Sequence, residues 1–129
     1  MILLDTHVVL WLALQPEQLS EKAKRAIQAA RSADGLGISP ITLLEIGQLV
    51  GRNRVQLDVP LEVFLDTTER TFLIAPITAR IAYLSQQFSE AYPRDPADRI
   101  IGATALTEGT LLVTADDRIR RSGEVRTIW

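Results

Sequence analysis

The sequence contains no cysteine, and this absence excludes two kinds of structure. Without thiols there is no disulfide framework and no metal site built from thiolates. A chain of 129 residues, of which 47% are hydrophobic, is long enough to bury a core without such cross-links. We therefore expect a protein of a reducing compartment, the cytoplasm.

A long uninterrupted hydrophobic run is also missing. The opening segment MILLDTHVVLWLAL is largely apolar, but Asp5 and His7 interrupt it and no basic segment precedes it. Neither a secretion signal nor a membrane span fits this pattern. We expect a soluble protein without a membrane partner.

Positive charge and aromatic side chains are both scarce. The 14 basic residues face 16 acidic ones, so the net charge is −2, and nucleic acid cannot be held by a global positive field. Any contact with phosphates must be local. Aromatic residues make up 5% of the chain, which predicts no platform of rings for single-stranded bases.

Strand and helix patterns alternate along the chain, without a repeat or a linker. Short apolar runs predict strands at residues 2–4, 36–38, 72–75 and 111–114, with an edge strand at 125–128. Caps and apolar stripes predict helices at residues 7–14, 20–32, 40–51, from about 60, after Thr78, and at 97–108. The helix after Thr78 is predicted to carry Phe88 on its apolar face. The alternation predicts a single domain over residues 1–129, a three-layer α/β/α sandwich with a central, mainly parallel sheet.

Four acidic residues from separate segments are predicted to meet at one edge of this sheet. Asp5 and Asp116 follow strands, and ligands bind beyond the carboxyl ends of parallel strands. Glu45 and Asp98 lie on the apolar sides of their helices. Carboxylates gathered in one crevice repel each other unless a cation neutralises them. Oxygen ligands alone favour Mg²⁺ or Mn²⁺, which activate water toward a phosphodiester.

Four segments of the chain resemble the PIN domain family, specifically the VapC-type toxin ribonucleases of toxin–antitoxin pairs. They are LDTH at 4–7, SPITLLE at 39–45, DPADR at 95–99 and LVTAD at 112–116, and the match covers nearly the whole chain. The resemblance implies a PIN-like fold and a metal-dependent endoribonuclease. The implied ligands of Mg²⁺ or Mn²⁺, which are also the catalytic residues, are Asp5, Glu45, Asp98 and Asp116.

The resemblance also implies supporting residues and partners. Thr114 is a hydrogen-bonding helper and Asp95 an auxiliary acid. Many relatives have a histidine two residues before the DPADR segment, where this chain has Pro93, so no histidine is assigned there. The implied partners are a second copy of the chain, a cognate antitoxin that blocks the cleft, and a structured RNA such as transfer RNA. Arg94 and Arg99 flank the predicted site and are the candidate contacts with RNA phosphates.

Each acidic residue taken alone also has an ordinary structural explanation. The alternatives are helix N-caps for Asp5 and Asp116, an ion pair with Arg52 or Arg99 for Glu45, a favourable first-turn charge for Asp98, and a turn for Asp95 before Pro96. The lone His7 is expected to pack or form hydrogen bonds near the site rather than to bind a metal. The functional prediction therefore depends on the acids occurring together.

Two other functions compete with a nuclease. A phosphoacceptor signalling domain also groups aspartates beside Mg²⁺, but it needs a lysine after a late strand, whereas Lys22 and Lys24 lie early in a helix. The remaining alternative is a non-catalytic PIN-like module that binds RNA or a protein. A metal titration of RNA cleavage separates this module from a nuclease.

Overall fold

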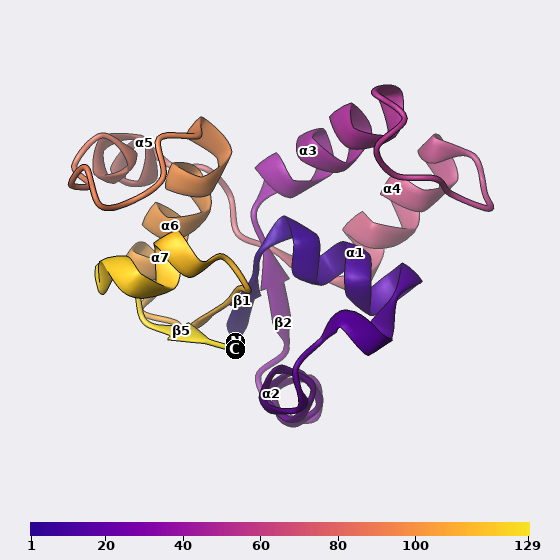
Figure 1. Ribbon diagram of the computed structural model, residues 1–129, viewed down its shortest axis with the longest axis horizontal. Coiled ribbons are helices and arrows are strands. Elements are labelled where there is room, and N and C mark those ends of the chain that lie inside the picture. Colours follow the sequence, from indigo (N-terminus) through magenta and orange to yellow (C-terminus); the bar gives the residue numbers. More distant parts are fainter.

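The computed structural model describes residues 1–129 and contains a five-stranded sheet between two groups of helices (Figure 1). The strands are β1 (Ile2–Leu4), β2 (Leu36–Ile38), β3 (Leu73–Ile74), β4 (Leu112–Val113) and β5 (Thr127–Ile128). The helices are α1 (Thr6–Leu14), α2 (Glu21–Arg31), α3 (Pro40–Gly51), α4 (Leu61–Thr71), α5 (Ala79–Ser85), α6 (Pro96–Glu108) and α7 (Asp117–Ser122), with a short 3-10 helix, η1 (Pro16–Gln18). None of these helices combines the length and apolar character needed to cross a bilayer.

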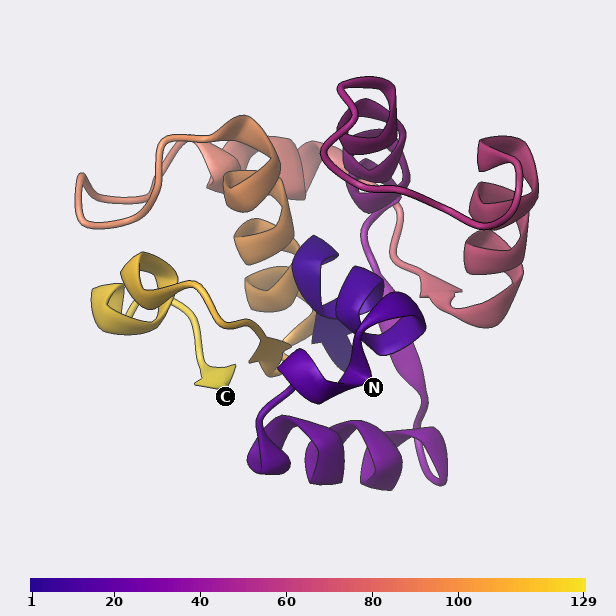
Figure 2. The same cartoon turned by 45° about the vertical axis from the view of Figure 1, so that its right-hand side comes forward.

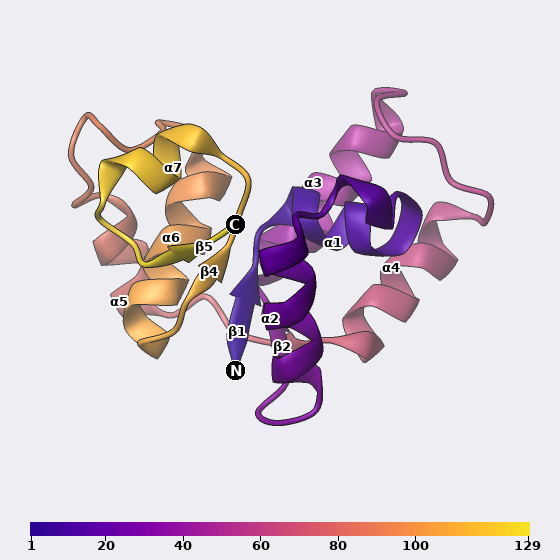
Figure 3. The same cartoon turned by 60° about the horizontal axis from the view of Figure 1, so that its bottom comes forward.

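All neighbouring strands pair in parallel, in the order β3-β2-β1-β4-β5. The two faces of the sheet are covered by different helices, because successive side chains of a strand point to opposite sides. Leu4 of β1 packs with residues of α1, α2 and α3, whereas Leu3 packs with residues of α6 and α7. Figures 1 and 3 show α1, α3 and α4 on one side of β1, and α5, α6 and α7 on the other. The predicted three-layer α/β/α sandwich is confirmed.

The helices begin at the capping residues that the sequence offers. The side-chain oxygens of Ser20, Ser39 and Thr78 accept hydrogen bonds from backbone N–H groups in the first turns of α2, α3 and α5. Gly109 ends α6 with a left-handed φ of 62°, a conformation that glycine adopts without steric cost. These boundaries agree with the predicted ones.

Some segments differ from the prediction. The strands expected at 72–75, 111–114 and 125–128 are only two residues long. Two of them, β3 and β5, are edge strands, which pair on one side only. Helix α5 ends at Ser85, so the prediction that Phe88 lies on that helix is wrong. Phe88 instead stacks on Tyr92 from the following loop, with ring centroids 4.0 Å apart, and so still contributes to the core.

The strand order creates a switch point between β1 and β4. The chain builds β1, β2 and β3 toward one edge of the sheet, then returns to the other side of β1 and adds β4 and β5. Connections leaving two such neighbouring strands diverge and leave a crevice beyond their carboxyl ends. Asp5 follows β1 and Thr114 follows β4, so the fold places both at this crevice.

Candidate active site

Asp5 and Thr114 are joined across the switch point. Leu4 pairs with Val113 in the sheet, so the next residue of each strand emerges beside the other. The Thr114 hydroxyl donates to Oδ2 of Asp5 at 2.7 Å, and the Thr6 N–H donates to Oδ1 at 2.8 Å. Asp5 is thereby both the N-cap of α1 and a buried acid. Burial raises the pKa of the Asp5 carboxyl, and the two hydrogen bonds oppose this rise only in part.

Glu45 reaches the same crevice from α3. The Thr6 hydroxyl donates to Oε1 of Glu45, and the Thr42 hydroxyl lies 3.0 Å from that of Thr6. A hydroxyl has only one proton, so Thr42 is the donor to Thr6. Burial raises the pKa of Glu45, the Thr6 hydrogen bond lowers it, and the charges of Asp5 and Asp95 raise it again. The acid on the apolar stripe of α3 is therefore held by a chain of two threonine hydroxyls.

Asp98 is partly buried in the first turn of α6 and has a strongly shifted pKa. Burial is the largest cause of the rise to about 8, followed by the charges of Asp5, Asp95, Glu45 and Asp116. The Tyr92 hydroxyl donates to the backbone carbonyl oxygen of Asp98 at 2.8 Å and so supports the helix, but it does not reach the carboxylate. The Asp98 carboxylate thus faces like charges without a protein donor.

Asp116 and Asp95 begin helices at the same edge of the sheet. Oδ1 of Asp116 accepts hydrogen bonds from two backbone N–H groups of α7, and its own N–H donates to Oγ1 of Thr114. Oδ1 of Asp95 accepts a hydrogen bond from a backbone N–H of α6. The capping roles considered for Asp5 and Asp116 are therefore observed, and Asp95 adds a third. These roles leave Oδ2 of Asp116 and of Asp95 without a protein donor.

No lysine or arginine neutralises Asp5, Glu45, Asp98 and Asp116, which we call the acidic quartet. The ion pairs of the molecule involve other acids, namely Asp34, Glu21, Asp66 and Asp117. The alternative in which Glu45 pairs with Arg52 or Arg99 is therefore wrong. Arg99 instead donates to the backbone carbonyl oxygens of Pro93 and Ser89, at 2.9 and 3.5 Å.

The donor chemistry of the acidic quartet suits a hard divalent cation. All four side chains offer carboxylate oxygens, which Mg²⁺ and Mn²⁺ prefer. Their charges raise the pKa of Asp98, and a bound cation would relieve that repulsion. As placed, however, no three acidic or histidine side chains lie close enough to ligate one ion jointly. Binding would therefore require the carboxylates to turn toward a common centre.

Three residues at the site were missed by the sequence reasoning: Thr6, Thr42 and Tyr92. Thr42 lies one helical turn before Glu45, so its spacing could have indicated a contact on the same side of the helix. Thr6 directly follows Asp5 but gave no signal that it would reach α3. Tyr92 is fully buried, which raises the pKa of its hydroxyl, and nothing in the loop sequence around it predicts that burial.

Three residues flank the acidic quartet without an ion pair to its carboxylates: His7, Arg94 and Arg99. His7 is exposed, and its ring centroid lies 6.0 Å from that of Trp11. Arg94 is exposed beside Asp95 and forms no ion pair. Arg99 is partly buried and tied to backbone carbonyls. Contacts of the two arginines with RNA stay predictions.

Comparison with known proteins connects this arrangement to a family. The sequence model that represents the PIN domain family matches residues 2–125 of this chain. The chain is 35% identical to Ribonuclease VapC22 of Mycobacterium tuberculosis, in an alignment that covers 99% of this chain and 98% of that protein.

Solved structures also have a similar fold. VapBC2 from Rickettsia felis, bound to a DNA fragment from its promoter, gives a TM-score of 0.72 at 17% identity, covering 98% of this chain and 97% of that chain. DNA-bound VapBC from Salmonella typhimurium gives a TM-score of 0.72 at 18% identity, with the same coverage of 98% and 97%. At these identities the likeness concerns the fold alone. The family match and the full-length relative together establish that the chain belongs to the PIN domain family.

Proposed function

We propose that residues 1–129 act as one PIN-like domain, a divalent-metal-dependent endoribonuclease that is the toxin of a toxin–antitoxin pair. The observation that carries this proposal is that the charges of Asp5, Glu45 and Asp116, from distant segments, act on Asp98, while none of the four acids has a cationic partner. Its support from known proteins is the full-length relative, which is itself a VapC ribonuclease.

In this proposal Asp5, Glu45, Asp98 and Asp116 would hold Mg²⁺ or Mn²⁺. The ion, when bound, supplies positive charge for the phosphodiester and lowers the pKa of the attacking water. The chain itself orients the ligands, because Thr114 fixes Oδ2 of Asp5 and Thr6 fixes Oε1 of Glu45.

The outer residues of the site would bind and position the RNA. Asp95 acts as an auxiliary acid whose Oδ2 has no protein donor. Arg94 and Arg99 contact RNA phosphates on the side of α6. The products carry a 5′-phosphate and a 3′-hydroxyl.

The proposed partners are a cognate antitoxin, a second copy of the chain and a structured RNA such as transfer RNA, all met in the cytoplasm. A toxin–antitoxin complex from Klebsiella pneumoniae has a similar structure, with 25% identity and a TM-score of 0.61 over 90% of this chain, which supports a partner for this chain. Helices α3 and α4 and the segment before α4 also expose apolar side chains, with Leu44 56%, Val63 50% and Val59 45% exposed. Exposed apolar side chains of this kind are suited to contact with another protein.

Two neighbouring aspartates give a matched test of the proposal. Asp116→Asn should abolish cleavage of RNA in the presence of Mg²⁺, whereas Asp117→Asn, which changes an exposed acid paired with Arg120, should keep it. Both variants retain a side chain that can begin or precede α7. EDTA should abolish RNA cleavage by the wild type, and added Mg²⁺ or Mn²⁺ should restore this cleavage. Equal cleavage by the two variants would contradict the proposal.

The second candidate function is a PIN-like module that binds RNA or protein without cleaving. It is favoured by one observation, that no three acidic or histidine side chains are grouped for a single ion. This candidate predicts that the purified chain binds RNA, or a protein, equally with EDTA and with Mg²⁺, and releases no cleaved product under either condition.

A further inference from the structure

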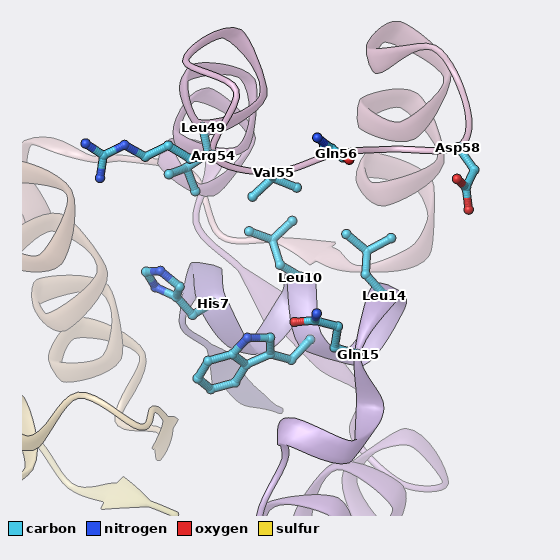
Figure 4. A pocket seen from close by; sticks show the side chains of 10 residues that line it. His7, Leu10, Leu14, Gln15, Leu49, Arg54, Val55, Gln56 and Asp58 are labelled. Carbon is cyan, nitrogen blue, oxygen red and sulfur yellow. The ribbon is translucent and has the colours of Figure 1, made fainter.

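A pocket of about 570 Å³ opens between α1 and the segment that links α3 to α4 (Figure 4). Figure 2 shows the course of that segment from α3 to α4. This volume lies in the range of roughly 300–1,000 Å³ that is typical of small-ligand sites. His7 lines the pocket, and it lies in the first turn of α1, two residues after Asp5, which caps that helix. The pocket therefore begins at the same end of α1 as one member of the acidic quartet.

Two aromatic rings, those of His7 and Trp11, line this pocket, and the ring of Trp129 contacts that of Trp11. The ring centroids of His7 and Trp11 are 6.0 Å apart, and those of Trp11 and Trp129 are 5.8 Å apart. His7 and Trp11 lie one turn apart on α1, and both line the pocket. Trp129 supports Trp11 from the end of the chain. A partly buried indole beside a cavity is a surface on which an unpaired base can stack.

Polar side chains also line the pocket, with Arg54 at one end and Asp58 at the other (Figure 4). Arg54 lines the pocket and forms no ion pair, and Figure 4 shows it across the opening from His7. An unpaired guanidinium is well suited to a phosphate. The amides of Gln15 and Gln56 both donate and accept hydrogen bonds, as the edge of a base requires. An apolar peptide segment would make no use of these groups.

We propose that this pocket binds one unpaired nucleotide of the RNA substrate, with its base against Trp11 and a phosphate at Arg54. The inference rests on the proposed function, because it places this nucleotide beside the one that is cleaved at the acidic quartet. Only an unpaired base can enter the pocket, because the bases of a duplex are stacked on one another.

Tryptophan fluorescence provides a test that does not require cleavage. The chain has two tryptophans, so Trp129→Phe leaves Trp11 as the only one and keeps a ring beside it. In EDTA, a short single-stranded RNA of mixed sequence should quench Trp11, and the same strand annealed to its complement should not. Adding Arg54→Ala should raise the apparent Kd by about tenfold. Arg52→Ala is the matched control, because Arg52 is also an exposed arginine of the same segment but does not line the pocket.

The outcomes separate this inference from the nuclease proposal. If the wild type cleaves RNA with Mg²⁺ but single-stranded RNA leaves Trp11 emission unchanged, the pocket inference is overturned and the nuclease stands. If Trp11 responds and Arg54→Ala alone weakens binding, the pocket is supported even where no cleavage occurs. A response to a co-expressed antitoxin but not to RNA would make the pocket a protein-docking surface and overturn the inference. Equal effects of Arg52→Ala and Arg54→Ala would also overturn it.

Discussion

Thr114 donates a hydrogen bond of 2.7 Å to Oδ2 of Asp5, although 109 positions separate the two residues in the sequence. The same hydroxyl accepts a hydrogen bond from the N–H of Asp116 at 3.1 Å. One fully buried oxygen thus connects two members of the acidic quartet, one after β1 and one after β4. The position of these acids relative to each other depends on a threonine that carries no charge.

Thr114→Val should therefore weaken both the fold and the site. The change leaves the buried Oδ2 of Asp5 and the N–H of Asp116 without their partner, and such a loss costs about 1–3 kcal/mol in the free energy of unfolding. RNA cleavage should fall as well, since Asp5 is no longer held. Urea denaturation and a cleavage assay measure the two effects. Thr114→Ser keeps the hydroxyl and should stay near the wild type, and equal losses in both variants would rule out the hydrogen bond as the cause.

The raised pKa of Asp98 predicts a stability that falls with rising pH. The ordinary pKa is 3.8 and the folded value is about 8, so between these values the unfolded chain releases the proton while the folded protein keeps it. The free energy of unfolding should decrease across this window and level off above it.

Asp98→Asn removes the carboxyl that causes this dependence. In EDTA at a pH of about 9 the variant should be more stable than the wild type by about 1 kcal/mol or more, and near a pH of about 4 the difference should vanish. Chemical denaturation at the two pH values measures this. Asp117→Asn, at an exposed acid, should follow the wild-type profile. If the stability of Asp98→Asn changed with pH in the same way as that of the wild type, the Asp98 carboxyl would not be the cause of the pH dependence.

Divalent metal should stabilise the folded protein through the acidic quartet. An ion that binds only the folded state at about 100 times its Kd adds about 2.7 kcal/mol to the free energy of unfolding. The gain should be larger at a pH of about 9 than at about 6, because the proton on Asp98 must leave before a cation binds. Thermal unfolding with and without Mg²⁺ or Mn²⁺ measures it. An undiminished gain in Asp98→Asn would place the ion elsewhere.

Gly102 allows Tyr92 to lie under the first turn of α6. A methyl group at this position would meet the Tyr92 hydroxyl and lie 3.0 Å from the Phe88 ring. Gly102→Ala should therefore cost about 1–3 kcal/mol in the free energy of unfolding. Adding Tyr92→Phe should recover part of this loss, which a double-mutant cycle detects.

Gly47→Ala is the matched control for this prediction. Gly47 also lies inside a helix, but no atom lies within 4 Å of an added methyl group. The substitution should stabilise the protein by roughly 0.5–1 kcal/mol, because alanine is the better helix former. A loss of stability at Gly47 equal to that at Gly102 would contradict the prediction, because it would show that a loss occurs without the contact with Tyr92.

Local sequence patterns were sufficient to predict the order of the strands and of the helices from α1 to α6, but they did not predict the short helix α7. Ile2–Leu4 could be recognised as a buried strand because all three residues are apolar, and Ser39 before Pro40 marks the start of α3. The length of the edge strands could not be predicted, because it depends on pairing with a neighbour rather than on composition. Phe88 shows the same limit, since a partly buried ring on a helical spacing need not lie on a helix.

Local sequence patterns could not predict contacts between residues that lie far apart in the sequence. The hydrogen bond from Thr6 to Glu45 joins α1 to α3, and the contact of Trp11 with Trp129 joins α1 to the end of the chain. Neither pair has a periodic relation in the sequence. Composition does not show such proximity either, because two tryptophans 118 positions apart give no sign in the sequence that the fold brings them together.

The three aspartates that cap helices constrain how this protein can change over evolutionary time. Asp5, Asp95 and Asp116 begin α1, α6 and α7, and serine, threonine or asparagine would serve equally well for that purpose alone. A descendant that lost catalysis would still be selected to keep such a residue at these three positions. Asp98 is not a helix cap, so other residues could replace it once catalysis is no longer selected. An aspartate at position 98 of a relative is therefore a clearer indication of retained catalysis than an aspartate at position 5, 95 or 116.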